Sequence, residues 1–552
     1  MAFGSNNNDN SQSNNNNNNN IFSHILLAKI INFINDNIDR IVFTLVCKKW
    51  YNERDKYLSF NNHHINIIND RNNKYIHLNS YKSMIIDDIN RKTKNKAIFG
   101  RDFFRYYYDY VITKDQFDDI ERFKRLNIDK LKIGLEQNAE NQENIKKIYR
   151  LISDLNIPKL KYVQSISELP MNITSLSFCY MFREEVVPGC LPPNLKTLKF
   201  GRYFNQPILA GVLPSTLEKL IFNKSFNHPL EPGVLPSSLK ILKFKQSTFQ
   251  QDIKFGTFPS NLEVLEFSGN ISTIEDGVLP LRLRILENAP TSWLPQIKTL
   301  TNLKTLTVGN ASQDFHMDLN CLPASLTRLE FRTRITLINE MPPTIRYLDI
   351  EKCDYDFNSV FKDRSMYQLD YLRLKPIDST TTILDDMKIK ELEFNMMIDD
   401  GSIAMKNSKD SKEEVDIPFG IETLSVQLTS KFQKSISIPS SVKKLVLSKE
   451  LDCIGGLQKR YDMSGAGSIQ ELVIVCDEIS FFSQRNSVYI PPIIFAPTTL
   501  IHLCDIRNEK IWIRMIHNQY YLVYSQSPIM TAIVHKSQIY KYILYIINVY
   551  QK

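Results

Sequence analysis

The middle of the chain repeats one pattern of apolar and polar positions. Five segments that begin with glycine align without gaps: GCLPPNLKTLKF at Gly189, GVLPSTLEKLIF at Gly211, GVLPSSLKILKF at Gly233, GTFPSNLEVLEF at Gly256 and GVLPLRLRILEN at Gly277. Their starts are 22, 22, 23 and 21 residues apart. A fixed period of this length is typical of a solenoid, in which each repeat forms one coil.

A shorter pattern, Leu-x-x-Leu-x-apolar, continues this register in both directions. It occurs as ITSLSF before the five segments, and as LKTLTV, LTRLEF, IRYLDI, LDYLRL, IKELEF, IETLSV, VKKLVL, IQELVI and LIHLCD after them. We therefore expect about fifteen coils with a period of about 22 residues. They occupy residues 151–505, and the strongest repeats are at 189–288.

Each coil is predicted to contain a short strand with one buried face. In LEKLIF, Leu220 and Phe222 alternate with Lys219 and Ile221, which is the period of a strand. One coil cannot cover its own leucines, so stacked coils bury each other's. The fold class that follows is a mixed α+β protein built on a leucine-rich-repeat-like parallel β solenoid. The leucines predicted to form its core include Leu195, Leu198, Leu217, Leu220, Leu239 and Leu242.

Glycine and proline separate the coils. Gly211 and Gly233 permit a tight bend, and Pro214 and Pro236 prevent a helix or strand from continuing. Because about 22 residues leave little room beside the strand, we expect short extended or 3₁₀ segments on the convex side.

A second motif follows some strands, as FNQP at Phe204 and FNHP at Phe226. The phenylalanines are predicted to fill the core. Asn205 and Asn227, together with Gln250, are expected to bond backbone groups of adjoining coils, since buried amides need partners. The alternative is that each is an ordinary turn asparagine before proline.

Four further regions flank the repeats. Residues 1–20 are rich in Asn and predicted to be disordered. Residues 21–60 have apolar residues at helical spacing and are expected to form two short helices. Residues 61–150 are interpreted as a helical connector and N-terminal cap, although NKYIHLNSY has the character of a strand. Residues 506–552 are expected to cap the other end of the array.

The composition and charge of the chain limit the classes of function that we expect. The net charge of +8 is small for 552 residues, and no block of Lys or Arg indicates a nucleic-acid or membrane partner. Eight scattered cysteines without a Cys-x-x-Cys pair, no signal peptide and no long apolar run predict a soluble, cytoplasmic or nuclear protein. No phosphate-binding, zinc-protease or serine-hydrolase motif is present, so we expect no enzyme activity, cofactor or metal.

Two resemblances follow from these motifs. FNQP and FNHP with the GVLPSSL-type segments resemble the FNIP repeat, a short leucine-rich-repeat variant of social amoebae, although Gln206 and His228 replace its isoleucine. VCKKW at residues 46–50, after an apolar helix, resembles an F-box. An F-box implies docking on a Skp-type adaptor of a cullin ubiquitin ligase, here through Ile25, Leu26, Ile30, Phe33, Val46, Cys47 and Trp50. Phe22 stands where that family usually has proline. The alternative is that these helices only cap the solenoid.

The strand positions between buried leucines are predicted to form a concave target-binding face. Tyr and Arg are frequent interface anchors, and the face is basic in its early coils. An acidic partner is therefore expected there. The residues of this face are Lys199, Lys219, Ile221, Lys243, Glu266, Arg328, Glu330, Tyr347, Tyr371 and Arg373.

Together these features predict a protein–protein interaction subunit. The resemblance to an F-box implies that it recruits a target protein to a ubiquitin ligase. An interaction scaffold without a ligase role is the alternative, and an enzyme whose site has no recognisable motif is a weaker third.

Overall fold

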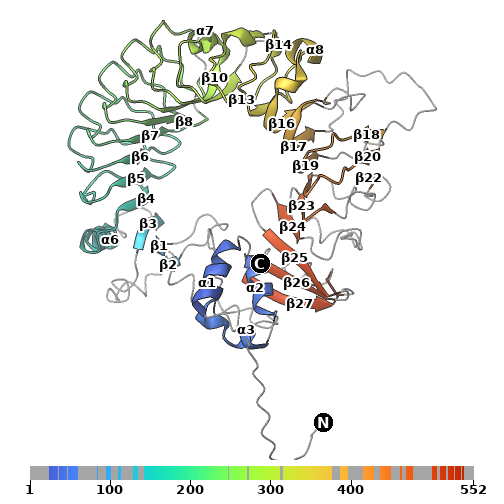
Figure 1. The fold of residues 1–552 in the computed structure, drawn as a ribbon. Coiled ribbons are helices and arrows are strands. Elements are labelled where there is room, and N and C mark those ends of the chain that lie inside the picture. The colour runs from blue at the N-terminus through green and yellow to red at the C-terminus, as the bar shows by residue number, and fades with distance from the viewer. Residues whose placement is uncertain are drawn as a thin grey trace, which may run out of the picture.

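The computed structural model of the chain is a curved array of coils (Figure 1). It describes residues 24–34, 37–46, 48–59, 84, 95–100, 110–112, 128–134, 142–246, 248–269, 273–310, 315–375, 384, 386–395, 414–427, 435–448, 461–462, 468–476, 500–505, 510–517, 520–526, 529–535, 538–539 and 542. The Asn-rich segment 1–20 lies outside these residues, and so does the strand-like NKYIHLNSY.

Each Leu-x-x-Leu segment of the sequence lies on a strand, and each strand pairs in parallel with the next. The strands line the inner side of the arc (Figure 1). The predicted parallel solenoid is confirmed. The strands are β5 (Ser175–Phe178), β6 (Thr197–Lys199), β7 (Lys219–Phe222), β8 (Ile241–Phe244), β9 (Val264–Phe267), β10 (Ile285–Pro290), β11 (Thr305–Asn310), β13 (Arg328–Phe331), β15 (Tyr347–Asp349), β16 (Gln368–Leu374), β17 (Lys388–Asn395), β19 (Thr423–Gln427), β21 (Lys444–Ser448), β23 (Glu471–Cys476) and β24 (Leu500–Asp505).

The core is a set of columns in which the same residue type repeats from coil to coil. Leu198, Leu220 and Leu242 are register partners and fully buried. The other predicted core leucines, Leu195, Leu217 and Leu239, are fully buried as well. A second column contains phenylalanines: Phe200 and Phe222 stack with ring centroids 5.5 Å apart. Each coil therefore supplies apolar surface that its neighbour covers, which makes the array stable only collectively.

The FNxP motif has both of the predicted contacts. Phe204 is buried and stacks on Phe200 at 3.9 Å. The Asn205 side-chain oxygen accepts from the backbone N–H of Asn227 at 2.9 Å, and the Asn227 oxygen accepts from that of Gln250 at 2.8 Å. The amide ladder lies at the surface, however, so it supports backbone groups that water also reaches.

The bends between coils have the predicted glycine geometry. Gly211 and Gly233 have φ of 82° and 86°, a conformation that other residues rarely adopt. The proline that follows has a further role, because the Pro214 carbonyl accepts from the backbone N–H of Leu217 at 3.0 Å and closes a turn before the strand.

From β5 to β24, the connections between strands contain only short helices where the structure describes them, as the repeat length predicts. They are η4 (Thr291–Trp293), α7 (Leu294–Ile297), η5 (Leu319–Cys321), α8 (Phe357–Val360) and η6 (Arg364–Met366). Two small sheets also lie in these connections. One contains β12 (His316–Asp318) and β14 (Thr336–Ile338). The other contains β18 (Glu414–Asp416), β20 (Ser435–Ser437) and β22 (Tyr461–Asp462).

The prediction of a helical connector over residues 61–150 is wrong in part. Helix α6 (Gln142–Asp154) is present, but β1 (Asn95–Gly100), β2 (Tyr110–Ile112), β3 (Ile128–Gly134) and β4 (Lys159–Val163) extend the sheet in parallel. The sheet therefore begins well before the first recognisable repeat. Residues 114–126, within the predicted helical connector, lie outside the described residues.

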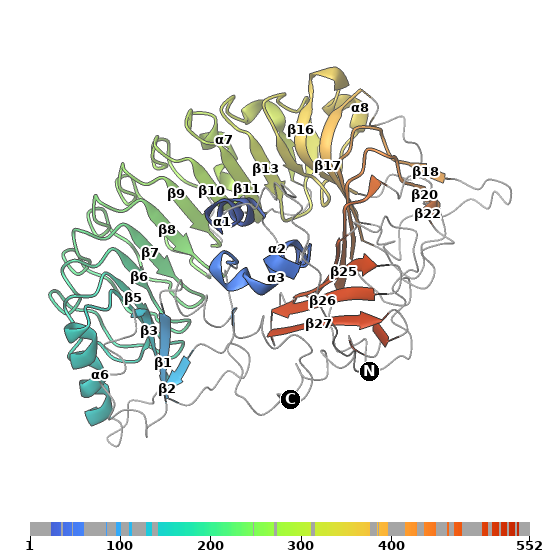
Figure 2. The same ribbon diagram turned by 60° about the horizontal axis from the view of Figure 1, so that its bottom comes forward.

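At the other end, the last parallel strand has a different register from the predicted one. In β24, Ile501 and Leu503 pair with Leu472 and Ile474, so Leu500 does not occupy a core-leucine position. Three antiparallel strands follow: β25 (Lys510–His517), β26 (Tyr520–Gln526) and β27 (Ile529–His535). They end the parallel array at the position where the sequence predicts a cap (Figure 2).

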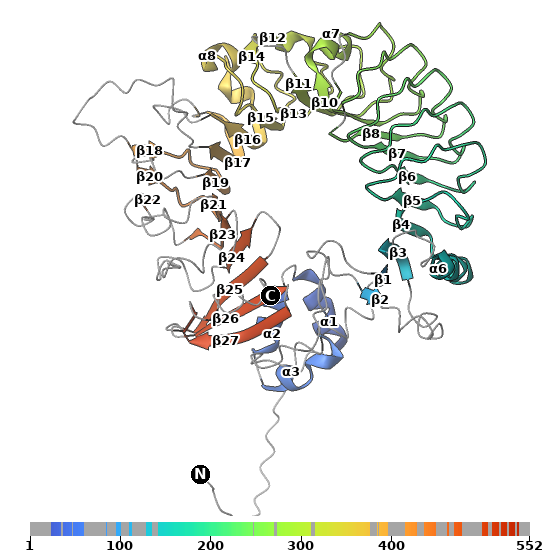
Figure 3. The same ribbon diagram turned by 180° about the vertical axis from the view of Figure 1, so that it is seen from behind.

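The N-terminal helices lie in the opening between the two ends of the arc (Figures 1 and 3). They are α1 (His24–Phe33), α2 (Asn37–Thr44), α3 (Lys48–Asn52) and η1 (Arg54–Lys56). Leu27, Ile31 and Ile41 form one apolar cluster with Leu522 and Tyr524 of β26. The first helices of the chain are therefore packed on its last strands.

Candidate functional site

The concave face consists of the strand residues that alternate with the buried leucines. The burial pattern along β8 and β9 is partly exposed, buried, partly exposed, buried, which is the predicted alternation. Parallel register aligns the outward positions into rows that cross the coils. One row begins Lys199, Ile221, Lys243 and Glu266.

The early coils present cations without counter-charges. Lys199 is exposed and Lys219 half-buried, and neither forms an ion pair within the described segments. Desolvation of its ammonium group by neighbouring atoms and the nearby ammonium group of Lys245 lower the pKa of Lys199. Ile221 differs from the prediction, since it is buried between the two lysines of its row, whose long side chains can cover an aliphatic neighbour.

The prediction that Lys243 extends this basic area is wrong. Its Nζ lies 3.0 Å from a carboxylate oxygen of Glu266 and 3.0 Å from one of Glu287. Partial burial alone would lower the pKa of Lys243, but the two carboxylates raise it. Lys243 is therefore paired with two acidic residues of the next coils.

The central coils hold the predicted aromatic and arginine anchors in one network. The Arg328 guanidinium lies 3.5 Å from the ring centroid of Tyr347 and bonds the Glu330 carboxylate through Nε at 2.7 Å. The Tyr371 hydroxyl donates to Glu393 at 2.7 Å. Burial and Glu393 together raise the pKa of Tyr371 far above its ordinary value.

Arg373 completes this network. Its guanidinium lies within ion-pair distance of Glu351 at 2.7 Å, Glu393 at 3.3 Å and Asp349 at 3.6 Å. The structure thus brings the predicted central residues together. Their polar groups are already engaged in hydrogen bonds and ion pairs within this network. In binding a partner, these residues would provide a preformed, rigid surface.

A group of residues that the sequence reasoning missed lies in the turns after β5 and β6. Tyr180 and Tyr203 stand edge to face, with ring centroids 4.9 Å apart and an interplanar angle of 86°. Arg202 lies over Tyr180 and Arg183 over Tyr203, at 5.5 and 5.2 Å. The repeat gives only part of the signal, since Tyr180 stands two residues after Phe178 and Tyr203 three residues after Phe200. The 22-residue offset between β5 and β6 therefore aligns Tyr180 with Arg202.

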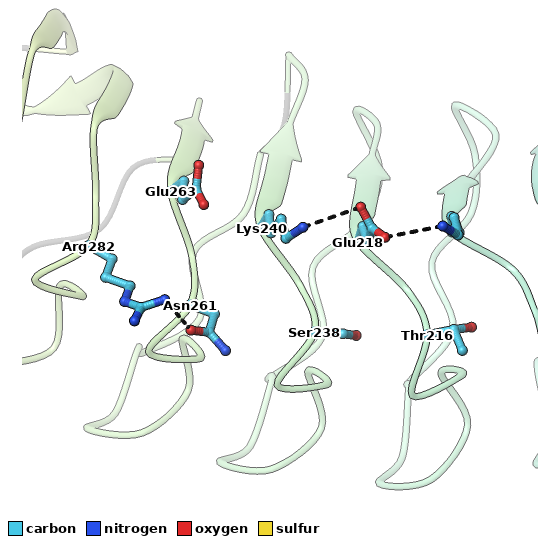
Figure 4. Close-up of a pocket in the computed structure, with 8 residues that line it drawn as sticks. Thr216, Glu218, Ser238, Lys240, Asn261, Glu263 and Arg282 are labelled. Atoms are coloured by element: carbon cyan, nitrogen blue, oxygen red, sulfur yellow. Dashed lines mark hydrogen bonds and ion pairs between the residues drawn. The ribbon is translucent and has the colours of Figure 1, made fainter.

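A hollow on the opposite edge of the strands was also missed (Figure 4). Lys196 and Lys240 each lie 3.6 Å from a carboxylate oxygen of Glu218. The alternating charge at the first position after each repeat leucine would have indicated this row. Its lining residues are Lys196, Thr216, Glu218, Ser238, Lys240, Asn261, Glu263 and Arg282. The hydroxyl and amide groups of Thr216, Ser238 and Asn261 bond backbone carbonyls, so the hollow holds few free donors.

The residues predicted to bind an adaptor divide into two groups. Ile25, Leu26, Phe33 and Val46 are exposed by 73%, 40%, 86% and 66%. Ile30 is half-buried, and it shares a helix face with Leu26 and Phe33 because it lies four residues after the first and three before the second.

Trp50 does not belong to that exposed group. It is half-buried, stacks on Phe43 with ring centroids 4.7 Å apart and contacts the cluster of Leu27 and Ile31. Its backbone carbonyl accepts from the Tyr57 hydroxyl. Trp50 therefore holds the helices together, and Cys47 lies outside the described residues.

Two further findings concern chemistry and membranes. Among the residues that the structure describes, no group of His, Cys, Asp and Glu is arranged to hold a metal ion. No helix in these segments combines the length and apolarity needed to cross a bilayer.

The chain contains FNIP repeats. A sequence model described as FNIP Repeat matches residues 182–225 and 226–270. A search of curated proteins gives no match. Among solved structures, the chain is similar to the circular leucine-rich-repeat protein CroV588, at 20% identity and a TM-score of 0.37, over 70% of this chain and 59% of that one. It is also similar to YopM from Yersinia enterocolitica, at 20% identity and a TM-score of 0.31, over 53% of this chain and 64% of that one. The chain thus spans less than two thirds of either protein. What the comparisons establish is that the chain contains FNIP repeats.

Proposed function

We propose that the chain is a substrate-recruiting subunit, in which the N-terminal helices bind a Skp-type adaptor and the solenoid binds a target protein. The repeat solenoid is consistent with a protein-interaction role. The observation that carries the adaptor part is the division of apolar residues on α1. Leu27 and Ile31 face the β26 cluster, whereas Leu26 and Phe33, one position before and two after them, are exposed.

An exposed apolar stripe on a packed helix needs an explanation. Phe33 is 86% exposed and Val46 66% exposed, which is costly in water unless a partner covers them. The F-box-like VCKKW segment includes Val46 and follows α2 in the chain. Because the rest of the helical module is held by β26, this stripe would reach an adaptor without unfolding the module.

A pull-down with purified Skp-type adaptor tests the proposal. We expect wild-type protein to retain the adaptor and the variant Ile25→Asp/Phe33→Asp to lose it. Trp50→Ala is a poor choice, since Trp50 packs against Phe43 and its loss would disturb the helices. The matched control is Leu209→Asp/Leu281→Asp, which changes two solenoid residues that are 62% and 64% exposed. Equal retention by the first variant and wild type would contradict adaptor docking at this stripe.

The second candidate is an interaction scaffold without a ligase role. It is favoured by the contact of Leu27, Ile31 and Ile41 with Leu522 and Tyr524, because this contact gives the helices a structural role of their own. In that case the wild-type protein would not retain the adaptor. Deleting residues 21–60 would still lower the melting temperature by exposing β26.

A further inference from the structure

The turns after the early strands present a row of cations. Arg202 and Lys224 each stand two residues after a core phenylalanine, Phe200 and Phe222. Adjacent turns touch, since the backbone N–H of Ser225 donates to the Arg202 carbonyl at 3.1 Å. Lys199 lies on the strand before Arg202, and Lys245 follows β8. We call Lys199, Arg202, Lys224 and Lys245, with Tyr180 and Tyr203, the early basic surface.

The charges of this surface are not neutralised by any ion pair within the described part of the chain. None of its four cations forms an ion pair in the segments that the structure describes, and three of them are exposed. Other lysines of the same coils are paired, such as Lys243 with Glu266 and Lys196 with Glu218. Desolvation lowers the pKa of Lys199, and the ammonium group of Lys245 close by lowers it further because the two like charges repel. A negatively charged ligand would relieve this repulsion.

The neighbouring carboxylate does not supply that charge. Glu184 accepts from the Ser165 hydroxyl at 3.0 Å and from the backbone N–H of Ile166 at 2.9 Å. It is thereby held toward the preceding coil. The surface therefore remains basic while the next coils, from Glu266 onward, contain their own ion pairs.

The tyrosines favour a peptide over a nucleic acid. Base recognition by aromatic residues requires open ring faces on which bases can stack. Here the two rings are perpendicular, their hydroxyl oxygens lie 3.3 Å apart, and each ring has an arginine over it. Hydroxyl and guanidinium groups placed side by side suit carboxylates, which accept from both.

We propose that the early basic surface docks an acidic peptide segment of the target protein. This inference rests on the proposed function, in which the solenoid is the target-binding part. The surface spans four coils, which is about 15 Å at the usual spacing of parallel strands. An extended segment of about five residues has that length, so two or three of its carboxylates could meet the cations.

Fluorescence anisotropy on the full chain tests the inference. The probe is a fluorescein-labelled decapeptide of Asp, Glu and Tyr. We expect saturable binding that weakens with added salt, and a loss of about tenfold in affinity for Arg202→Glu/Lys224→Glu. The matched control is Lys298→Glu/Lys362→Glu, which makes the same change in charge beside α7 and α8 on the outer side of the arc and should bind like wild type (Figure 1).

Three results would overturn the inference: no binding of the acidic decapeptide, equal binding of its counterpart with Asn and Gln in place of Asp and Glu, or tighter binding of a labelled ten-nucleotide oligouridylate. The last result would identify a nucleic-acid surface instead. Adaptor retention is measured on the same proteins. If adaptor is retained but the decapeptide does not bind, the inference is wrong while adaptor docking stands. If the decapeptide binds but the wild-type protein does not retain the adaptor, adaptor docking is wrong while the inference stands.

Discussion

Tyr347 and Tyr371, from neighbouring strands, stack with ring centroids 4.2 Å apart and an interplanar angle of 9°. They are register partners on the concave face. The stack joins the cation–π contact of Arg328 to the hydrogen bond between Tyr371 and Glu393. One network of side chains therefore crosses the central coils, although the residues are far apart in the sequence.

Removing the Tyr371 hydroxyl should weaken this network. Tyr371→Phe leaves the ring stack in place but deletes the bond to Glu393, and we expect the free energy of unfolding to fall by about 1 kcal/mol. Urea denaturation followed by circular dichroism measures the change. A Tyr371 variant as stable as wild type would mean that the bond adds nothing in water.

Two substitutions of Asn227 test how much the hydrogen bonds of the amide ladder stabilise the fold. Asn227→Ala removes the acceptor of the Gln250 backbone N–H and should lower the free energy of unfolding by about 1 kcal/mol. Asn227→Asp keeps an oxygen at that position and should retain most of the stability. If both variants lose the same amount, the asparagine acts through its turn conformation and the ladder does not matter.

The core columns should be sensitive to a single truncation. Leu242 is fully buried between register partners, and Leu242→Ala should cost about 2–5 kcal/mol because it leaves a cavity in two coils. Leu281→Ala, at a residue that is 64% exposed, should cost far less. Thermal melts of the two variants measure this difference in stability. Similar melting temperatures would argue against the stacked core.

The Lys243 ion pairs should depend on pH in a defined direction. The two carboxylates raise the folded-state pKa of Lys243 above its ordinary value of 10.5, so the ion pairs contribute their full stability below that pH. The contribution is then lost as the pH rises through the folded-state value. The stability difference between wild type and Lys243→Met should therefore be constant from pH 7 to 9 and shrink in stronger alkali. A difference that grows with alkali would contradict this assignment.

Much of the fold follows from local pattern. The columns of Leu220 and Phe222, the left-handed Gly211 and the ladder from Asn205 repeat with the sequence, because each coil meets a copy of itself. The register of β24, in contrast, could not be predicted from the repeat pattern. Leu500 and Leu503 fit the repeat pattern as well as Ile501 and Leu503 do, and the choice depends on the N-terminal cluster, which Leu500 contacts.

The candidate site was less predictable for a physical reason. Strand alternation shows that Lys199 and Lys243 face the same side, but it does not show which of them meets an acid. Glu287, one of the two partners of Lys243, is 44 residues away. Similarly, the helical spacing of residues 25–34 was recognised, yet Leu27 and Ile31 became the buried stripe because β26 covers that face.

Adaptor docking is tested most directly by isothermal titration of the full chain with purified Skp-type adaptor. The account predicts a stoichiometric complex with wild type, and an affinity at least about tenfold lower for Phe33→Asp/Val46→Asp, while Leu209→Asp/Leu281→Asp binds like wild type. No heat of binding with wild type, or equal affinity for all three proteins, would contradict it.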